Sequence, residues 1–123
     1  MDFKQITIIG TGLIGGSFAL AARQAGFRGE IVGCDREPVL MKAHDFGAID
    51  RPVANPEEAV KGSDLVVLAT PVGSIIDLLE RIGPLVSADA LITDVGSTKV
   101  EIMTRAHDVF GKDVAKRDRK SVV

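Results

Sequence analysis

The stretch ITIIGTGLIGGSFALAARQAG, residues 6–26, joins a short apolar run to a cluster of glycines and then to a run of small residues with a helical pattern. Gly10, Gly12, Gly15 and Gly16 fall within seven positions. A glycine inside a helix or strand costs about 0.5–1 kcal/mol relative to alanine. A stretch that repeats this cost predicts a place where the backbone must come close to something else, either another segment of the chain or a ligand.

The composition around this stretch is that of one folded domain. Of the 123 residues, 46% are hydrophobic, which is enough for a core without disulfides, and the single cysteine, Cys34, suits a reducing compartment. Fifteen basic residues against seventeen acidic ones give a net charge of −2, which argues against general binding of nucleic acid. The sequence shows no signal peptide and no membrane span, so we expect a cytoplasmic protein without a membrane partner. No metal site is predicted.

Strand and helix patterns alternate along the chain. Strands are predicted at 6–9, 30–34, 51–53, 65–69 and 91–93, and helices lead up to Gly26 and span about 38–46, 55–62, 75–82 and 98–110. The main strands are apolar throughout, as expected for a parallel sheet that is covered on both faces. This alternation predicts an α/β fold, an open doubly wound parallel sheet, over residues 1–111, with a charged and disordered tail at 112–123.

Two helices are predicted to bury a defined set of side chains. In the first helix the residues expected to face the sheet are Phe18, Ala21, Ala22 and Ala25. In the helix at 75–82 the apolar stripe is expected to consist of Ile75, Ile76, Leu79 and Ile82.

The pattern Gly10-x-Gly12-x-x-Gly15 directly follows a predicted strand and opens a predicted helix. In that setting the first glycine permits a tight turn, the second lets the backbone approach a pyrophosphate, and the third lets helix and strand pack closely. Asp35 ends the second strand, twenty residues after Gly15, where an acid that binds a ribose belongs. The alternative is a tight turn that binds nothing. Together the features favour a Rossmann-type dinucleotide-binding domain.

Asp35 also bears on which dinucleotide is bound. A carboxylate there accepts from the 2′-hydroxyl of the adenosine ribose and repels a 2′-phosphate, which favours NAD over NADP. Arg36 complicates this choice, because it can lie over the adenine ring, pair with a 2′-phosphate if Asp35 turns away, or stand in solvent at the start of a helix.

Two further segments follow predicted strands, at the edge of the sheet where such folds bind ligands. The segment 70–73, Thr-Pro-Val-Gly, is expected near the middle of the cofactor, or is an ordinary strand-to-helix turn. The segment 94–99, Asp-Val-Gly-Ser-Thr-Lys, brings a hydroxyl and an ammonium group to a helix start at the nicotinamide end. Its alternative role is to cap that helix.

Four segments, in this order and spacing, resemble the cofactor domain of prephenate and arogenate dehydrogenases: ITIIGTGLIGGSFALAARQAG, IVGCDRE, DLVVLATPV and ITDVGSTK. The resemblance covers about residues 4–111, and its most specific pieces are GLIGGS and DVGSTK. It implies a two-domain, usually dimeric NAD(P)-dependent enzyme of tyrosine biosynthesis. That enzyme oxidatively decarboxylates the small molecule prephenate to 4-hydroxyphenylpyruvate.

The resemblance also implies roles for individual residues. The residues that would contact the pyrophosphate are Gly10, Gly12, Leu13, Ile14 and Gly15, and those at the adenosine ribose are Asp35 and Arg36. The nicotinamide side would be lined by Thr70, Pro71 and Val72. Ser97 is similar to the family's active-site serine, which hydrogen-bonds the catalytic histidine and the substrate hydroxyl, and Lys99 would help to build the substrate side.

The sequence departs from the family after residue 111. The family continues into a sixth strand and a Gly-Gly-His-Pro segment that supplies the general base, whereas this chain reads KDVAKRDRKSVV. His44 and His107 do not match that position and are interpreted as solvated helix residues. The basic tail favours disorder over nucleic-acid binding. We interpret the chain as a short form, from a gene truncated or frameshifted or from a chain that works with a separate partner, and we expect it to be inactive alone.

Two other functions fit part of the pattern. One is the cofactor domain of another small-substrate oxidoreductase, of the pyrroline-carboxylate reductase or 3-hydroxyacid dehydrogenase type, in which DVGSTK is not expected. The other is a non-enzymatic nucleotide-sensing module, which would not need Ser97. The sequence leaves prephenate and arogenate equal as substrates.

Overall fold

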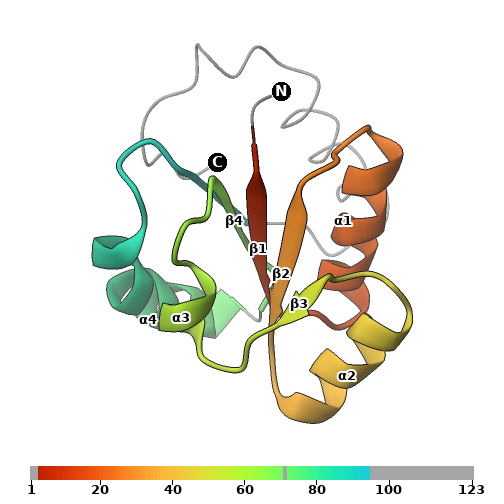
Figure 1. The fold of residues 1–123 in the computed structure, drawn as a ribbon. Helices are drawn as coiled ribbons and strands as arrows, with labels where there is room; N and C mark the ends of the chain where they lie inside the picture. Colours follow the sequence, from red (N-terminus) through yellow and green to blue (C-terminus); the bar gives the residue numbers. More distant parts are fainter. Residues whose placement is uncertain (1–2, 71, 95–123) are drawn as a thin grey trace.

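The computed structural model of the chain describes residues 3–70 and 72–94, with the backbone alone for Leu13 and residues 72–75. Within these residues, five parallel strands form one sheet in the order β3-β2-β1-β4-β5 (Figure 1). The strands are β1 Gln5–Ile9, β2 Glu30–Cys34, β3 Arg51–Pro52, β4 Leu65–Leu68 and β5 Leu91–Asp94. The predicted doubly wound α/β fold is confirmed.

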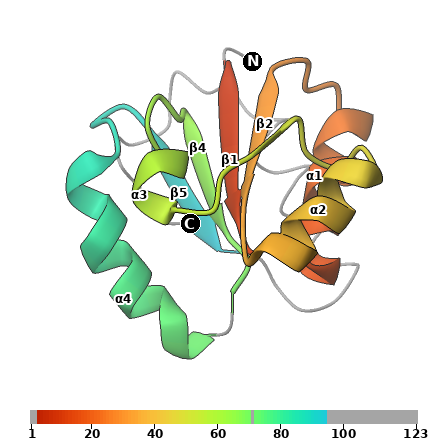
Figure 2. The same ribbon diagram turned by 60° about the horizontal axis from the view of Figure 1, so that its bottom comes forward.

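Helices cover both faces of the sheet. They are α1 Leu13–Gln24, α2 Glu37–Asp45, α3 Pro56–Ala59 and α4 Val72–Ile82, and a short 3₁₀ turn, η1, follows at Gly83–Leu85. Figure 2 shows α1 and α2 on one side of the strands and α3 and α4 on the other. The two layers follow from the strand order, since the chain winds in one direction from β1 to β3 and in the other from β4 to β5.

Each face of the sheet has its own apolar core. On the α1 side, Phe18 is fully buried and packs with Ile6 and Ile8 from the central strand. On the α4 side, Ile82 is fully buried and packs with Val66 and Leu68. Successive residues of a strand point to opposite faces, so these strands are apolar in a continuous run because both faces are covered.

Two details of the predicted helix faces are wrong. Phe18, Ala21 and Ala22 are buried as expected, but Ala25 is exposed, because α1 ends at Gln24 and the chain then turns through Gly26, at φ +105°. Phe27 takes the place against the sheet instead.

In α4 the buried face differs from the predicted stripe as well. Leu78 and Ile82, four positions apart, are buried, and Leu79 is half-buried. Ile76 is 69% exposed. The side chain of Ile75 lies outside the described part of the molecule.

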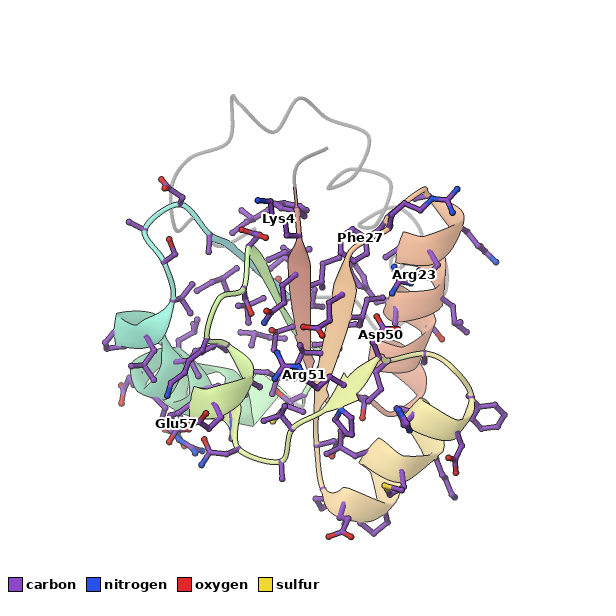
Figure 3. All side chains as sticks on the ribbon, in the orientation of Figure 1. Lys4, Arg23, Phe27, Asp50, Arg51 and Glu57 are labelled. Carbon is purple, nitrogen blue, oxygen red and sulfur yellow. The ribbon has the colours of Figure 1, made fainter. Side chains whose placement is uncertain are left out.

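The edge of the sheet at which the strands begin is held by charged side chains. The Arg23 guanidinium donates to the carbonyls of Phe27 and Gly29, at 3.0 and 2.7 Å, and to the carboxylate of Asp50 at 2.5 Å. It also lies 5.2 Å from the centre of the Phe27 ring (Figure 3). These contacts tie the end of α1 to the starts of β2 and β3, at the end of the sheet opposite the carboxyl ends of the strands.

The strand register aligns the carboxyl ends of the four longer strands. Ile9 pairs with Cys34 and with Leu68, and Leu68 pairs with Asp94. The segments that follow these strands therefore start at one edge. Between β1 and β4 the winding direction reverses, and this is where an open α/β sheet forms its binding crevice.

Candidate nucleotide-binding site

The turn after β1 leaves no room for side chains at two of its glycines. Gly10 has φ +96°, a conformation that favours glycine, and a Cβ there would lie 2.7 Å from the Ala69 carbonyl oxygen. A Cβ at Gly15 would lie 1.7 Å from the Gly10 carbonyl oxygen. These two glycines therefore let β1, α1 and the end of β4 pack against one another.

Gly12 is different, because a Cβ there would meet no atom within 4 Å. Gly12 is also the N-cap of α1. No side chain of the described residues caps that end, and no acidic residue lies in the first turn. In α3, by contrast, Asn55 accepts from the Glu58 amide at 3.1 Å, and Glu57 and Glu58 lie in the first turn. The start of α1 thus combines open space with a positive helix end whose own first turn carries no acidic side chain, which suits a phosphate.

Asp35 stands beside this turn, just beyond β2. One carboxylate oxygen, Oδ2, accepts from the Thr11 amide at 2.7 Å, and the other, Oδ1, accepts from the Arg36 amide at 2.6 Å. The side chain is half-buried. A carboxylate has about four lone-pair positions. Two of them remain for a ligand after these bonds are made.

A hollow of about 310 Å³ opens between the ends of β1, β2 and β4. It is lined by Gly10, Asp35 and Arg36, by Thr70 after β4, and by Ala54 and Pro56. The Thr70 hydroxyl is buried and makes no hydrogen bond to the described part of the chain. The structure thus brings Gly10, Asp35, Arg36 and Thr70, four of the residues singled out in the sequence, to the lining of one hollow.

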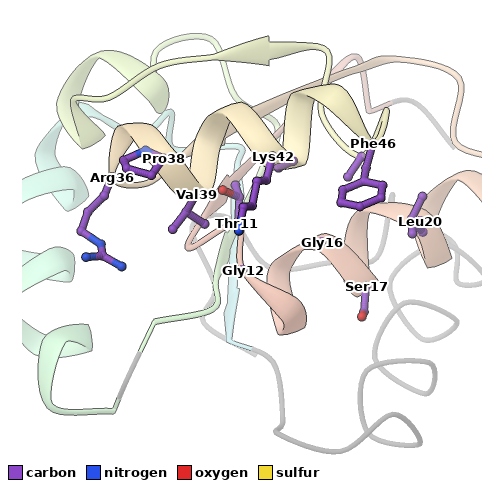
Figure 4. Close-up of a pocket in the computed structure, with 12 residues that line it drawn as sticks. Thr11, Gly12, Gly16, Ser17, Leu20, Arg36, Pro38, Val39, Lys42 and Phe46 are labelled. Carbon is purple, nitrogen blue, oxygen red and sulfur yellow. The ribbon is translucent and has the colours of Figure 1, made fainter.

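A larger groove of about 600 Å³ lies between α1 and α2 (Figure 4). Its lining is mostly apolar, and Leu20 and Phe46 on opposite helices are 49% and 83% exposed. The groove shares Arg36 with the smaller hollow and reaches Thr11 and Gly12. We assign the ligand site to the smaller hollow, because Asp35 and the crevice between β1 and β4 are there.

Cys34 takes part in the site through its backbone. Its carbonyl accepts from the Gly10 amide at 2.8 Å, and its thiol points at the Ala54 carbonyl oxygen, 3.6 Å away. Burial, with the neighbouring Asp35 carboxylate, raises the pKa of the thiol from 9.0 to about 11. The thiol is therefore protonated at neutral pH and is not a nucleophile there.

Several residues singled out by the sequence lie elsewhere. Ile14 is half-buried and packs against the α1-side core, and His44 is exposed on α2, as expected for a solvated residue. Leu13 begins α1 and Val72 begins α4, with only their backbones described. The remaining predicted residues, Pro71, Ser97, Lys99 and His107, lie outside the described residues, as does the tail at 112–123.

Four further parts of this site are not signalled by the sequence: the Thr11 amide, the Cys34 carbonyl, Ala54 and Pro56. The first two are backbone groups whose positions depend on the pairing of β1 with β2, so the residue types in the sequence do not indicate them. Ala54 and Pro56 are far along the chain, and Asn55-Pro56 signals only the start of a helix.

Among the described residues no helix is long and apolar enough to cross a bilayer.

The chain has recognisable relatives. Residues 18–115 match the model of the prephenate dehydrogenase nucleotide-binding domain. The prephenate dehydrogenase of Lactococcus lactis subsp. cremoris is 44% identical over 111 residues, covering 87% of this chain and 30% of that protein. The cyclohexadienyl dehydrogenase of Zymomonas mobilis is 33% identical over 107 residues, covering 86% and 36%.

Solved structures agree with these relatives. The prephenate dehydrogenase of A. aeolicus, crystallised with hydroxyphenyl propionate and NAD+, superposes with a TM-score of 0.71 at 33% identity, covering 91% of this chain and 40% of that chain. The arogenate dehydrogenase of Synechocystis gives 0.67 at 29% identity, covering 85% and 37%. This chain thus spans between 30% and 40% of the length of these relatives. The match to the family model and the 44% identity to a curated prephenate dehydrogenase show that the chain belongs to the prephenate dehydrogenase family, as its nucleotide-binding domain.

Proposed function

We propose that this chain binds NAD+ and supplies the cofactor half of a prephenate or arogenate dehydrogenase. The observation that carries the proposal is the open, uncapped start of α1 beside a carboxylate that keeps two lone-pair positions for a ligand. When bound, NAD+ would supply the acceptor for a hydride from the substrate. The described residues of this chain bind and orient that cofactor.

The residues present fit a dinucleotide. The pyrophosphate would lie over Gly12, where an added Cβ meets no atom within 4 Å, and would accept hydrogen bonds from amides of the first turn of α1, which have no partner within the helix. The adenosine would occupy the hollow of about 310 Å³, with its ribose at Asp35 and its adenine between Arg36 and the Ala54–Pro56 segment. The buried Thr70 hydroxyl would gain a partner in the ligand beyond the pyrophosphate.

The hydrogen bonds of Asp35 favour NAD+ over NADP+. A 2′-phosphate would stand against this carboxylate, so Asp35 would have to turn away for NADP+ to bind. Turning away breaks the bonds from the Thr11 and Arg36 amides. A hydrogen bond to a charged group contributes about 1.5–3 kcal/mol. Arg36, which lines both hollows, is the residue that would compensate by pairing with the phosphate.

The catalytic part of the proposal concerns residues beyond Asp94, the last residue described. Asp94 ends β5 in register with Leu68, so the DVGSTK segment starts from the edge that carries the nucleotide site. We propose that Ser97 is catalytic, hydrogen-bonding the substrate hydroxyl, and that Lys99 lies on the substrate side. Pro71 and Val72 would line the nicotinamide. A homodimer and a small cyclohexadiene acid as substrate are part of the same proposal.

Isothermal titration calorimetry of the purified chain with NAD+ and NADP+ tests the cofactor assignment. We expect binding of NAD+ and weaker binding of NADP+. Absence of heat with both nucleotides would contradict the proposed function. Tighter binding of NADP+ would contradict the argument from Asp35 and make Arg36 the controlling residue, which Arg36→Ala would then show by a selective loss of NADP+ affinity.

A further inference from the structure

Asp35 is attached to the phosphate-binding turn as well as to its own strand. The turn, residues 10–12, is fastened to the end of β2 by two backbone donors. The Gly10 amide bonds the Cys34 carbonyl at 2.8 Å, and the Thr11 amide bonds Asp35 Oδ2 at 2.7 Å. The first bond continues the pairing of β1 with β2, whereas the second depends on one side chain.

Among the described residues, the turn makes few other contacts toward the end of β2. A Cβ at Gly12 would find no neighbour within 4 Å, and the Thr11 hydroxyl, though buried, makes no hydrogen bond to the described part of the chain. The Thr11 methyl packs over Gly33 of β2, where a Cβ would come within 2.8 Å of it. The Asp35 bond is therefore the polar contact that sets the orientation of the peptide between Gly10 and Thr11.

We propose that Asp35 is a positioning residue for the pyrophosphate, in addition to a contact for the ribose: through the Thr11 amide it holds residues 10–12 in the conformation that receives the phosphates. This inference rests on the proposed function. It means that one carboxylate prepares both halves of the cofactor site, and that its loss weakens the phosphate half even when no ribose hydroxyl is present.

The carboxylate cannot be replaced by its amide in this role. Its two oxygens accept from two different amides, those of Thr11 and Arg36. Asparagine has one oxygen and one NH₂ group, so in either orientation an N–H faces another N–H. Asp35→Asn is thus a small change in volume that removes one of the two backbone bonds and, because the negative charge is lost, weakens the other.

The chain contains a matched control at the other end of β1. Asp64 accepts from the amides of Lys4 and Gln5, at 2.7 and 3.0 Å, but through the single oxygen Oδ2. The oxygen of an asparagine can accept both. Asp64→Asn therefore removes the same charge, at the edge of the sheet away from the nucleotide site, while it keeps the backbone bonds.

The test uses two ligands, NAD+ and an NAD+ analogue whose adenosine ribose lacks the 2′- and 3′-hydroxyls. Affinities are measured by calorimetry for the wild-type chain, Asp35→Asn and Asp64→Asn. If the carboxylate acts only by binding the ribose hydroxyls, it makes no contact with the dideoxy analogue. Removing its negative charge would then leave that affinity unchanged or raise it, because the pyrophosphate is an anion.

We expect Asp35→Asn to lower the affinity for the dideoxy analogue by about tenfold, as for the loss of one charge-assisted hydrogen bond. The affinity for NAD+ should fall further. Asp64→Asn should bind both ligands like the wild type. Equal or tighter binding of the analogue by Asp35→Asn would overturn the inference while leaving the proposed function intact. Failure of the wild-type chain to bind NAD+ would instead overturn the proposed function, and the inference with it.

A second variant covers the case in which Asp35→Asn does not fold. Asp35→Glu keeps the charge but moves the oxygens outward by one methylene, beyond the 2.7 Å contact with the Thr11 amide. We expect the same loss with the dideoxy analogue. Unchanged affinity of Asp35→Glu for the analogue contradicts the positioning role. Thermal melting of each variant records whether it is folded.

Discussion

The α carbon of Gly15 faces the carbonyl of Gly10 so closely that a Cβ on Gly15 would stand 1.7 Å from that oxygen. This contact joins the first turn of α1 to the end of β1. The neighbouring Gly16 has no such contact, because a Cβ there would lie 3.7 Å from the nearest atom, the Thr11 carbonyl oxygen. Of these two adjacent glycines in α1, only Gly16 leaves room for a side chain.

Gly15→Ala should destabilise the chain strongly, on the order of 3 kcal/mol, because the overlap is with backbone and requires α1 to move off the sheet. Chemical denaturation followed by circular dichroism measures this. Gly16→Ala is the control and should keep or raise stability, by up to about 1 kcal/mol, since alanine favours helix. Equal effects of the two substitutions would show that the 1.7 Å overlap is relieved without cost.

Gly12→Val should leave the fold intact and weaken NAD+ binding at least tenfold. No atom lies within 4 Å of the added Cβ, so the new side chain fills only the space assigned to the pyrophosphate. Melting temperature and calorimetry on the same sample separate the two effects. Undiminished affinity for NAD+ in a folded Gly12→Val chain would contradict the placement of the phosphates.

Cys34 should be unreactive toward a thiol reagent in the native chain at pH 8 and should react on unfolding. The reason is its burial, together with a pKa raised from 9.0 to about 11, which leaves little thiolate at that pH. Since it is the single cysteine, absorbance of the released chromophore reports this site alone. Rapid reaction under native conditions would mean that the end of β2 opens frequently.

The same raised pKa predicts a pH dependence of stability. Above pH 9 the thiol ionises in the unfolded chain while it stays protonated in the folded one until about pH 11, so the unfolded state binds fewer protons. The Cys34 contribution to the free energy of unfolding is then fully present below pH 9 and lost as pH rises toward 11. Chemical denaturation between pH 9 and 11 should show that the free energy of unfolding falls as pH rises, and that this fall is smaller in Cys34→Ala.

Ser97→Ala should lower kcat by an order of magnitude or more in a full-length relative, or in this chain fused to a second domain, while stability changes by less than about 2 kcal/mol. The expected cause is loss of the hydrogen bond to the substrate hydroxyl. Steady-state kinetics and thermal melting measure the two quantities. Unchanged kcat with a large loss of stability would favour the role of a helix cap.

The 123-residue chain by itself should bind cofactor without turning over prephenate or arogenate. It spans between 30% and 40% of the compared relatives. Holding a substrate in position beside the nicotinamide contributes about 7–11 kcal/mol of barrier reduction, and a general base contributes about 10²–10⁴-fold. Incubation with NAD+ or NADP+ and either substrate, followed by absorbance of the reduced cofactor, tests this. Sustained turnover above a buffer control would reveal a complete active site in these residues.

Much of the fold was predictable because the local signals agree with one another. The glycine spacing, the position of Asp35 relative to Gly15 and the continuous apolar strands are all visible along the chain, and the structure contains each of them. The buried face of α4 could not be predicted exactly from the sequence. Ile76 and Leu78 are equally apolar, and the packing of α4 against β4 and β5 decides which one is covered.

The site was predictable in its side chains and less so in its backbone. Asp35 and Gly12 were identified from spacing, but the bond between Asp35 and the Thr11 amide spans 24 positions. It exists because β1 and β2 pair in the register that brings Ile9 opposite Cys34. A contact of this kind is a property of the assembled sheet and leaves no mark in the residue types.

The position of β1 in the middle of the sheet has a consequence for how the chain is made. Its neighbour on one side, β2, follows within about thirty residues, but on the other side Ile6 pairs with Leu65. While the ribosome is still adding the residues between β2 and β4, the central strand β1 has one free edge, and such edges recruit other strands. Nascent chains in which β4 has not yet left the ribosome are therefore expected to depend on chaperones, and synthesis pauses before that point should lower the yield of soluble protein more than later pauses do.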